Sequence, residues 1–274
     1  MNTPTVVSAD WLYEHIGEAH IAIADCRFSL ADPELGQQQY NISHIPGASY
    51  FDLNKDLSSP VQQHGGRHPL PDLEVFAQKL STMGIDAQTL VVAYDDSRFA
   101  FAARLWWLLR YLGHDRIAVL DGGFKAWQSL KLPVTDAISP KTPKQFTCNL
   151  QPSLRVDITD VKARKDLPGV VLVDSREIPR YLGESEPIDP IAGHIPGAVN
   201  YPWQDVSSSD GYLYSPQEQL QYWQQLQGRE IIVYCGSGVT ACVNLLSLHL
   251  AGIDTSALYV GSWSDWCSYL LVDN

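Results

Sequence analysis

One cysteine of the chain follows directly on a segment that the sequence predicts to be a strand. The run 231–234 is short, apolar and rich in β-branched residues, and Cys235 comes next. Residues 236–240 (Gly-Ser-Gly-Val-Thr) then lead into an apolar stretch typical of a helix. Two glycines let such a loop curl with its backbone N–H groups turned inward, and the helix N-terminus adds positive partial charge. An anion-binding loop of this kind favours the thiolate, so the pattern predicts a nucleophilic thiol at position 235.

The other four cysteines lack this setting and are expected to be ordinary core or surface residues. An odd total of five widely spaced cysteines argues against a disulfide framework. No Cys-x-x-Cys pair is present and no Cys/His cluster has zinc spacing, so we expect no metal site.

Several short sequence motifs occur twice in the chain, in the same order. The repeated motifs are Asp25-x-Arg27 with Asp174-x-Arg176, and His44–Ala48 with His194–Ala198. The duplication predicts two copies of one domain. Because these motifs are also present in the half without the cysteine loop, we interpret each Asp-x-Arg motif as a buried ion pair at a strand end. We interpret the two histidines as residues that fix a loop by a hydrogen bond.

The cysteine loop itself is not duplicated. The first half has the corresponding strand near 91–94, but Asp95 and the residues 96–98 (Asp-Ser-Arg) follow it. We interpret this as one working site and one site that has lost its chemistry.

Alternating strand and helix patterns predict an α/β fold. Apolar runs at 21–24, 91–94, 117–120, 170–173 and 231–234 are typical of buried parallel strands, with helical patterns near 73–83, 100–112, 216–225 and 241–250. We expect two tandem domains, each a parallel sheet with helices on both faces, and reactive groups at the carboxyl ends of the strands. The predicted limits are 1–135 for a non-catalytic first domain, 136–154 for a proline-rich linker and 155–274 for a catalytic second domain.

Charge and hydropathy exclude some classes of partner. The 274 residues include 19 Lys and Arg against 31 Asp and Glu, a formal net charge of −12. Such a chain repels a phosphate backbone, so we expect no nucleic-acid partner. No apolar run approaches the ~20 residues that span a bilayer, and the first residues do not look like a signal peptide. We therefore expect no membrane partner and a cytoplasmic location.

Taken together, these motifs resemble the two-domain rhodanese-like sulfurtransferases, over nearly the whole chain. The resemblance also rests on the motifs Arg104–Trp107 and Gly122–Phe124. It implies two tandem rhodanese-like domains and a sulfur transfer through a persulfide on Cys235, without a metal or organic cofactor. A small anionic donor would supply the sulfur, and a thiol, cyanide or a thioredoxin-like protein would accept it. We expect a monomer.

The resemblance also assigns roles to individual residues. A Cys-Gly-Ser-Gly-Val-Thr loop is similar to that of the subclass using 3-mercaptopyruvate, in which Ser237 and His68 would form a polar relay with Cys235. The carboxylate expected upstream in that relay is Asn54 here, and the subclass's second arginine is missing from residues 184–189. The substrate-binding residues implied by the resemblance are Arg180, Gly236, Gly238, Val239 and Thr240.

Two further functions remain as alternatives. Because only Arg180 would bind the donor, thiosulfate could replace 3-mercaptopyruvate with the same persulfide mechanism. A non-catalytic or carrier protein that delivers persulfide sulfur to a protein partner is the second alternative. A Cys-x5-Arg phosphatase is disfavoured, because Ala241 stands where its phosphate-binding arginine would be.

Overall fold

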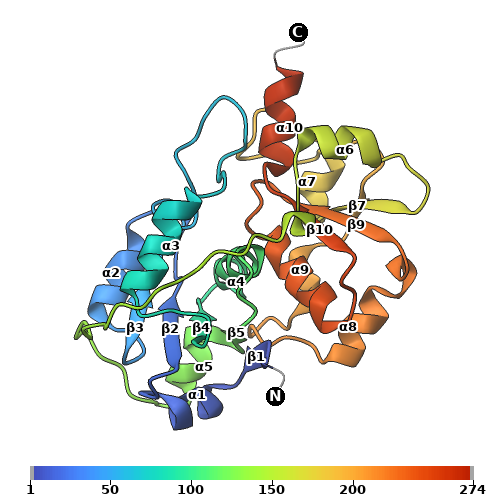
Figure 1. Ribbon diagram of the computed structural model, residues 1–274. Helices are drawn as coiled ribbons and strands as arrows, with labels where there is room; N and C mark the ends of the chain where they lie inside the picture. The colour runs from blue at the N-terminus through green and yellow to red at the C-terminus, as the bar shows by residue number, and fades with distance from the viewer. Residues whose placement is uncertain (1–2, 272–274) are drawn as a thin grey trace. The chain divides into compact units, whose positions relative to one another are not determined.

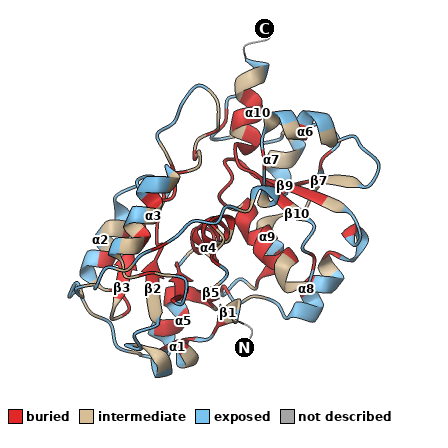
Figure 2. Cartoon of the chain, viewed as in Figure 1, coloured by how far each residue is buried: buried red, intermediate tan, exposed pale blue. Residues whose placement is uncertain are grey.

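The apolar runs form the central strands of two parallel sheets. The computed structural model describes residues 3–271. Strand β4 (Leu90–Tyr94) is buried along its whole length and β9 (Glu230–Tyr234) at all but its first residue, as Figure 2 shows by colour. Burial on both faces of a parallel sheet explains why these strands read as continuous apolar runs.

The first unit has a five-stranded parallel sheet among the described residues, in the order β1-β5-β4-β2-β3 (Figure 1). Its strands are β1 (Val6–Val7), β2 (Ile21–Asp25), β3 (Ala48–Tyr50), β4 and β5 (Ile117–Leu120). Its helices are α1 (Ala9–His15), α2 (Leu35–Ile42), α3 (Leu73–Thr82), α4 (Ala102–Tyr111) and α5 (Gly123–Ser129).

The second unit repeats this plan, with the strand order β6-β10-β9-β7-β8. Its strands are β6 (Arg155–Val156), β7 (Val170–Asp174), β8 (Val199–Asn200), β9 and β10 (Ser256–Tyr259). Its α-helices are α6 (Ile158–Arg164), α7 (Ile178–Leu182), α8 (Pro216–Tyr222), α9 (Ala241–Leu250) and α10 (Ser262–Leu270). No helix in the described part of the chain is long and apolar enough to cross a membrane.

Helices cover both faces of each sheet. Successive side chains of a strand point to opposite faces, so Val92 and Tyr94 share one face of β4. That face packs in one apolar cluster with Leu12 of α1 and Trp127 of α5, while α4 lies against the strands on the other side. In the second unit α6 and α10 share a cluster with alternate residues of β9, and α9 contacts the same strand. The predicted fold class is confirmed.

Each compact unit also includes a short segment from the other half of the chain. Pro60–Pro69 belongs to the second unit, and Ser209–Leu213 belongs to the first. The predicted domain limits, which did not include such an exchange, stay a prediction. The exchange matters for function because it assigns His68 and its neighbours to the unit that contains Cys235.

Backbone and side-chain hydrogen bonds fasten Pro60–Pro69 to α10. The N–H of Gly65 donates to Asp265 Oδ1 at 2.7 Å, and the N–H of Arg67 donates to Ser264 Oγ at 3.0 Å. Gly66 has φ +79°, and a Cβ there would lie 2.3 Å from a backbone oxygen of the second unit. A side chain at position 66 would therefore push the segment off the helix.

Each repeated Asp-x-Arg motif forms a buried ion pair, as predicted. Arg27 Nη2 lies 2.6 Å from Asp25 Oδ2, and Arg176 Nη2 lies 2.6 Å from Asp174 Oδ2, with all four side chains buried. Each guanidinium also donates to the carbonyl just before the repeated histidine, that of Ser43 or its counterpart in the second unit, at 2.7 Å. The pair thus ties the end of β2 or β7 to the loop that precedes the next strand, β3 or β8.

Both repeated histidines hold their loops by a hydrogen bond to the backbone. His44 Nδ1 lies 2.7 Å from the carbonyl oxygen of Tyr40, and His194 Nδ1 lies 2.7 Å from that of Tyr181. Each imidazole also stacks on the ring of that tyrosine, with centroids 4.0 Å apart. This agrees with the predicted loop-fixing role.

Asp95 occupies its own loop in the first unit. It follows β4 as Cys235 follows β9, and its carboxylate accepts four backbone N–H groups at 2.8–3.0 Å, from Ser97, Phe99, Phe101 and Ala102. Burial raises the pKa of Asp95, and the N–H donors offset only part of this rise. A carboxylate therefore fills the position at which the second unit presents a thiol.

Replacing Asp95 by alanine should destabilise the protein, because it removes the common acceptor of those N–H groups. We expect Asp95→Ala to lower the free energy of unfolding by about 3 kcal/mol in urea denaturation. The control is Asp115→Ala, since the Asp115 side chain is 83% exposed and its loss should change the value by less than about 0.5 kcal/mol. Equal stability of the two variants would contradict the role given to Asp95.

Candidate functional site

Cys235 lies in the loop between β9 and α9. It is 1% exposed, and the N–H of Gly238 donates to its sulfur at 3.2 Å. A hydrogen bond from a backbone N–H stabilises the thiolate relative to the thiol. For Gly238 the structure therefore shows the inward-turned N–H that the sequence predicted for this loop.

Glycine is required at position 238. Its φ of +74° lies in the left-handed region, and a Cβ would meet the carbonyl oxygen of Val260 at 2.2 Å. Any side chain there would move the N–H that contacts the sulfur.

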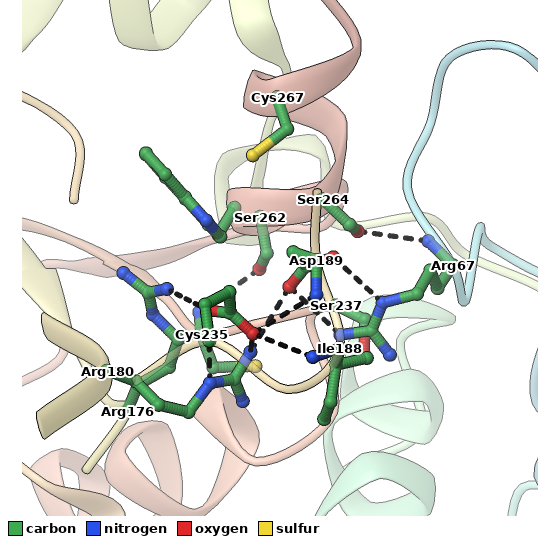
Figure 3. A network of polar contacts seen from close by, with 12 residues as sticks. Arg67, Arg176, Arg180, Ile188, Asp189, Cys235, Ser237, Ser262, Ser264 and Cys267 are labelled. Atoms are coloured by element: carbon green, nitrogen blue, oxygen red, sulfur yellow. Dashed lines mark hydrogen bonds and ion pairs between the residues drawn. The ribbon is translucent and has the colours of Figure 1, made fainter. Parts of the chain in front are cut away.

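The residues at the start of α10 hold the loop from the other side. The N–H groups of Trp263 and Ser264 donate to the carbonyls of Cys235 and Gly236, at 3.0 and 2.9 Å. The N–H of Cys235 donates to Ser262 Oγ at 3.1 Å (Figure 3). The loop backbone is thus bonded on both sides before any substrate arrives, which is the preorganisation that a charge-stabilising site needs.

His68 contacts Ser237, which is a residue of this loop. The Oγ of Ser237 lies 2.7 Å from Nδ1 of His68, and both residues are buried. They are 169 positions apart in the chain and come together because Pro60–Pro69 is part of the second unit. The structure therefore brings together the serine and the histidine of the predicted relay. Asn54, the third member considered, is exposed in the first unit.

Arg180 lies on α7 and is paired with two carboxylates. Its Nη2 donates to Asp189 at 3.2 Å (Figure 3). The same Nη2 donates to Glu186 at 2.7 Å, and Nε donates to Glu186 at 3.2 Å. Its guanidinium nitrogens lie 3.4 and 3.5 Å from the position that a Cβ on Gly236 would take. The predicted substrate arginine therefore borders the cysteine loop, and its acidic partners were not predicted.

Arg67 is a second arginine at the loop that the sequence reasoning missed. Its Nε and Nη2 donate to the two carboxylate oxygens of Asp189, at 3.0 and 3.3 Å. Its Nη2 lies 2.9 Å from the position that a Cβ on Gly236 would take. The only sequence signal was its place directly before His68, because Arg67 and Asp189 are 122 positions apart with no shared pattern.

Glu186 joins two arginines inside the site. It accepts hydrogen bonds from Arg176 Nη1 at 3.1 Å and from Arg180, and its side chain is 3% exposed. Burial alone would raise the pKa of Glu186, but the hydrogen bond from Arg180 and the N–H of Asp189 outweigh it. The pKa therefore lies below its ordinary value of 4.5, and the carboxylate stays ionised at neutral pH.

The remaining predicted loop residues line the same turn. Val239 is buried, and Thr240 is half-buried immediately before the first residue of α9. Gly236 lies next to the guanidinium groups of Arg67 and Arg180. Their role toward a substrate stays a prediction.

The other cysteines have surroundings unlike that of Cys235. Burial raises the pKa of Cys26, and it raises that of Cys267 to about 12. Cys148 is exposed, with a pKa that is also raised, and Cys242 is buried within α9. For Cys26, Cys148 and Cys267 the raised pKa disfavours the thiolate, as expected for thiols that do no chemistry.

The chain is similar to known proteins along almost its whole length. A family model described as the rhodanese-like domain matches residues 8–130 and again residues 157–269. A protein of Pseudomonas aeruginosa named probable 3-mercaptopyruvate sulfurtransferase is 44% identical over 272 residues, which cover 97% of this chain and 96% of that protein. The thiosulfate sulfurtransferase of Mus musculus is 34% identical over 275 residues, covering 95% of this chain and 91% of that protein.

Solved structures agree with these matches. The structure of a 3-mercaptopyruvate sulfotransferase from Escherichia coli has a TM-score of 0.81 at 33% identity, covering 96% of this chain and all of that one. That of a 3-mercaptopyruvate sulfurtransferase from Leishmania major has a TM-score of 0.83 at 28% identity, covering 99% of this chain and 76% of that one.

Replacing Glu186 should lower the free energy of unfolding at neutral pH, and this effect should diminish in acid. A carboxylate with a lowered pKa stabilises the fold fully above its ordinary pKa, and this stabilisation is lost as the pH falls through the lowered value. We expect Glu186→Gln to be less stable than the unmodified protein by about 3 kcal/mol near pH 7, because two guanidinium groups lose a partner. Urea denaturation at decreasing pH should show this difference shrinking below the ordinary pKa of 4.5.

Glu184→Gln is the matched control, because Glu184 is an exposed glutamate two positions away. It should show the pH dependence of the unmodified protein. A difference for Glu186→Gln that stays constant with pH would show that the ion pairs do not act through ionisation of this carboxylate.

Proposed function

Because the chain belongs to the rhodanese-like family, with two copies of its domain, we propose that it is a 3-mercaptopyruvate sulfurtransferase that acts through a persulfide on Cys235. The observation that carries the proposal is the hydrogen bond from Gly238 N–H to the sulfur of Cys235, in a loop bordered by two arginines. A stabilised thiolate beside guanidinium groups suits a reaction in which a nucleophilic sulfur attacks an anionic sulfur donor. Relatives named 3-mercaptopyruvate sulfurtransferase support this donor.

In the first step the Cys235 thiolate attacks the sulfur of the donor. A bond forms between the two sulfurs while the donor's carbon–sulfur bond breaks, with its electron pair passing to the carbon. The donor's thiol proton ends on that carbon and completes pyruvate. Cys235 is left as a persulfide, whose negative charge the N–H of Gly238 is placed to stabilise.

Ser237 and His68 are proposed to move the proton in this step. Their 2.7 Å hydrogen bond allows a proton to pass between hydroxyl and imidazole, and both groups are shielded from bulk water. In the second step an acceptor thiol attacks the outer persulfide sulfur, the sulfur–sulfur bond breaks, and the Cys235 thiolate is restored.

Thiosulfate is the competing donor. Relatives named thiosulfate sulfurtransferase are also similar over nearly the whole chain, and the same thiolate could attack thiosulfate. The loop sequence Cys-Gly-Ser-Gly-Val-Thr favours 3-mercaptopyruvate. Comparing kcat/KM for the two donors decides between them, and we expect the larger value with 3-mercaptopyruvate.

Incubation with 3-mercaptopyruvate should convert Cys235 to a persulfide. Intact-mass spectrometry should show an addition of about 32 Da, and dithiothreitol should remove it because a thiol accepts the outer sulfur. Cys235→Ser should show no addition, whereas Cys242→Ser, which alters another buried thiol of the same unit, should load fully. Full loading of Cys235→Ser would overturn the site assignment.

Removing the imidazole of His68 should slow persulfide formation. We expect His68→Gln to lower the single-turnover rate of loading by about 100-fold, because general acid–base assistance is lost. His20→Gln is the control, since the His20 side chain is 57% exposed in the first unit and should have no effect. Equal rates for these two variants would remove His68 from the mechanism.

A further inference from the structure

The first residue of α10 has a backbone conformation that is unusual for a residue with a side chain. Ser262 has a φ of +56°, in the left-handed region that favours glycine, and it is fully buried. Within the part of the second unit that the structure describes, it is the only non-glycine residue with a positive φ. Holding a serine in this conformation costs free energy, and such strained residues cluster at functional sites.

The first unit has glycine at the equivalent position. Gly123 is the first residue of α5, as Ser262 is of α10, and it has the same φ of +56°. In each unit the N–H of the next residue donates to the carbonyl of the residue after the central strand, which is Asp95 or Cys235, at 2.8 and 3.0 Å. Glycine therefore meets the backbone plan of the domain without strain, and that plan does not itself require a serine at this turn.

The hydroxyl of Ser262 contacts the backbone of the nucleophile. Its oxygen accepts the N–H of Cys235 at 3.1 Å (Figure 3). The same hydroxyl donates to the carbonyl of Tyr259, the last residue of β10, at 2.9 Å. A hydroxyl can make both bonds at once because it is both a donor and an acceptor. With glycine at position 262, the buried N–H of Cys235 would lose this acceptor.

Helix α10 does not use this hydroxyl for its own capping. A capping serine accepts an N–H group from the first turn of its own helix. Among residues 3–271, the only N–H group that the oxygen of Ser262 accepts is that of Cys235. The stability of the helix thus does not explain the strained serine, whereas its contact with Cys235 does.

This contact completes the fixation of Cys235. The carbonyl of Cys235 accepts the N–H of Trp263, so two consecutive residues of α10 bind both backbone polar groups of the nucleophile. Gly238, whose N–H donates to the Cys235 sulfur, lies against the carbonyl of Val260 in the same turn. The turn at 260–263 therefore holds the sulfur and its N–H donor relative to one another.

We infer that Ser262 is a positioning residue for the sulfur transfer at Cys235. Its hydroxyl fixes the Cys235 backbone so that the sulfur stays at the N–H of Gly238. The left-handed strain is retained because glycine would lose this contact. The inference rests on the proposed function and deepens it, since Ser262 acts on the rate of persulfide formation through Cys235 and not through the donor.

The test measures persulfide loading and stability in the same variants of the full chain. Single-turnover loading with 3-mercaptopyruvate, followed by intact-mass spectrometry, gives a maximal rate, a half-saturating donor concentration and a final extent. We expect Ser262→Gly and Ser262→Ala each to lower the maximal rate by about tenfold, because both lose the hydroxyl and a displaced nucleophile attacks more slowly. The half-saturating concentration should stay within about twofold, and both variants should load to completion.

Thermal unfolding should separate the two variants. Glycine adopts the left-handed conformation without strain, whereas alanine keeps the strain after the hydroxyl is lost. We expect the Tm of Ser262→Ala to lie about 2–4 °C below that of Ser262→Gly, although their loading rates are equal. A role confined to the stability of the fold would instead make the loading rate follow the Tm.

Two control variants each match one part of the change. Lys131 is exposed in the first unit and has a φ of +55°, so Lys131→Gly relieves the same kind of strain away from the site. Ser153 is exposed in the second unit, so Ser153→Ala removes a serine hydroxyl that does not contact Cys235. Both variants should load at the rate of the unmodified protein.

The possible failures are distinguishable. If the unmodified protein loads and Ser262→Gly loads equally fast, the inference is wrong and the proposed function stands. A raised half-saturating concentration with an unchanged maximal rate would also overturn it, because Ser262 would then act on donor binding. If the unmodified protein gains no persulfide from 3-mercaptopyruvate, the proposed function fails, and this inference fails with it.

Discussion

In both units, the loop between a central strand and the next helix surrounds a side chain that can carry negative charge. In the first unit Asp95 accepts four N–H groups from its own loop, and in the second unit Cys235 accepts one at its sulfur. Parallel strands end at the same edge of a sheet, and helix N-termini there present unpaired N–H groups. This geometry stabilises an anion, and the residue at the strand end decides whether that anion is structural or reactive.

Buried hydrogen bonds in each unit fix the edge of the sheet at which the strands end. A buried Asp–Arg pair joins the end of β2 or β7 to the loop that precedes the next strand, β3 or β8, and a tyrosine ending the neighbouring strand accepts an N–H from the same loop. In the second unit, burial would lower the pKa of Arg176, yet the hydrogen bonds that its guanidinium donates to Asp174 outweigh this effect and the pKa is raised. The pair thus stays ionised in the interior, and because both units need it, it recurs without regard to the cysteine.

The local parts of the fold followed from the sequence. Apolar runs predicted β4, β7 and β9 within one or two residues, because burial on both faces leaves a continuous apolar pattern. The glycines around Ser237 predicted a loop that turns an N–H toward Cys235, which is found for Gly238. The structure also brought His68 to Ser237, a pairing expected from family resemblance and not from the pattern of the residues.

By itself, the sequence determined the duplicated α/β plan, the position of the thiol at a strand end and the loss of that thiol from the first copy. These are local properties, set by side-chain periodicity and by the residues that a tight loop tolerates. Only the tertiary structure decided that Arg67 joins Arg180 through Asp189, and that Glu186 links Arg180 to Arg176. Arg67 and Asp189 lie 122 positions apart, and an ion pair over that separation leaves no periodic signal, since it depends on how Pro60–Pro69 crosses to the second unit.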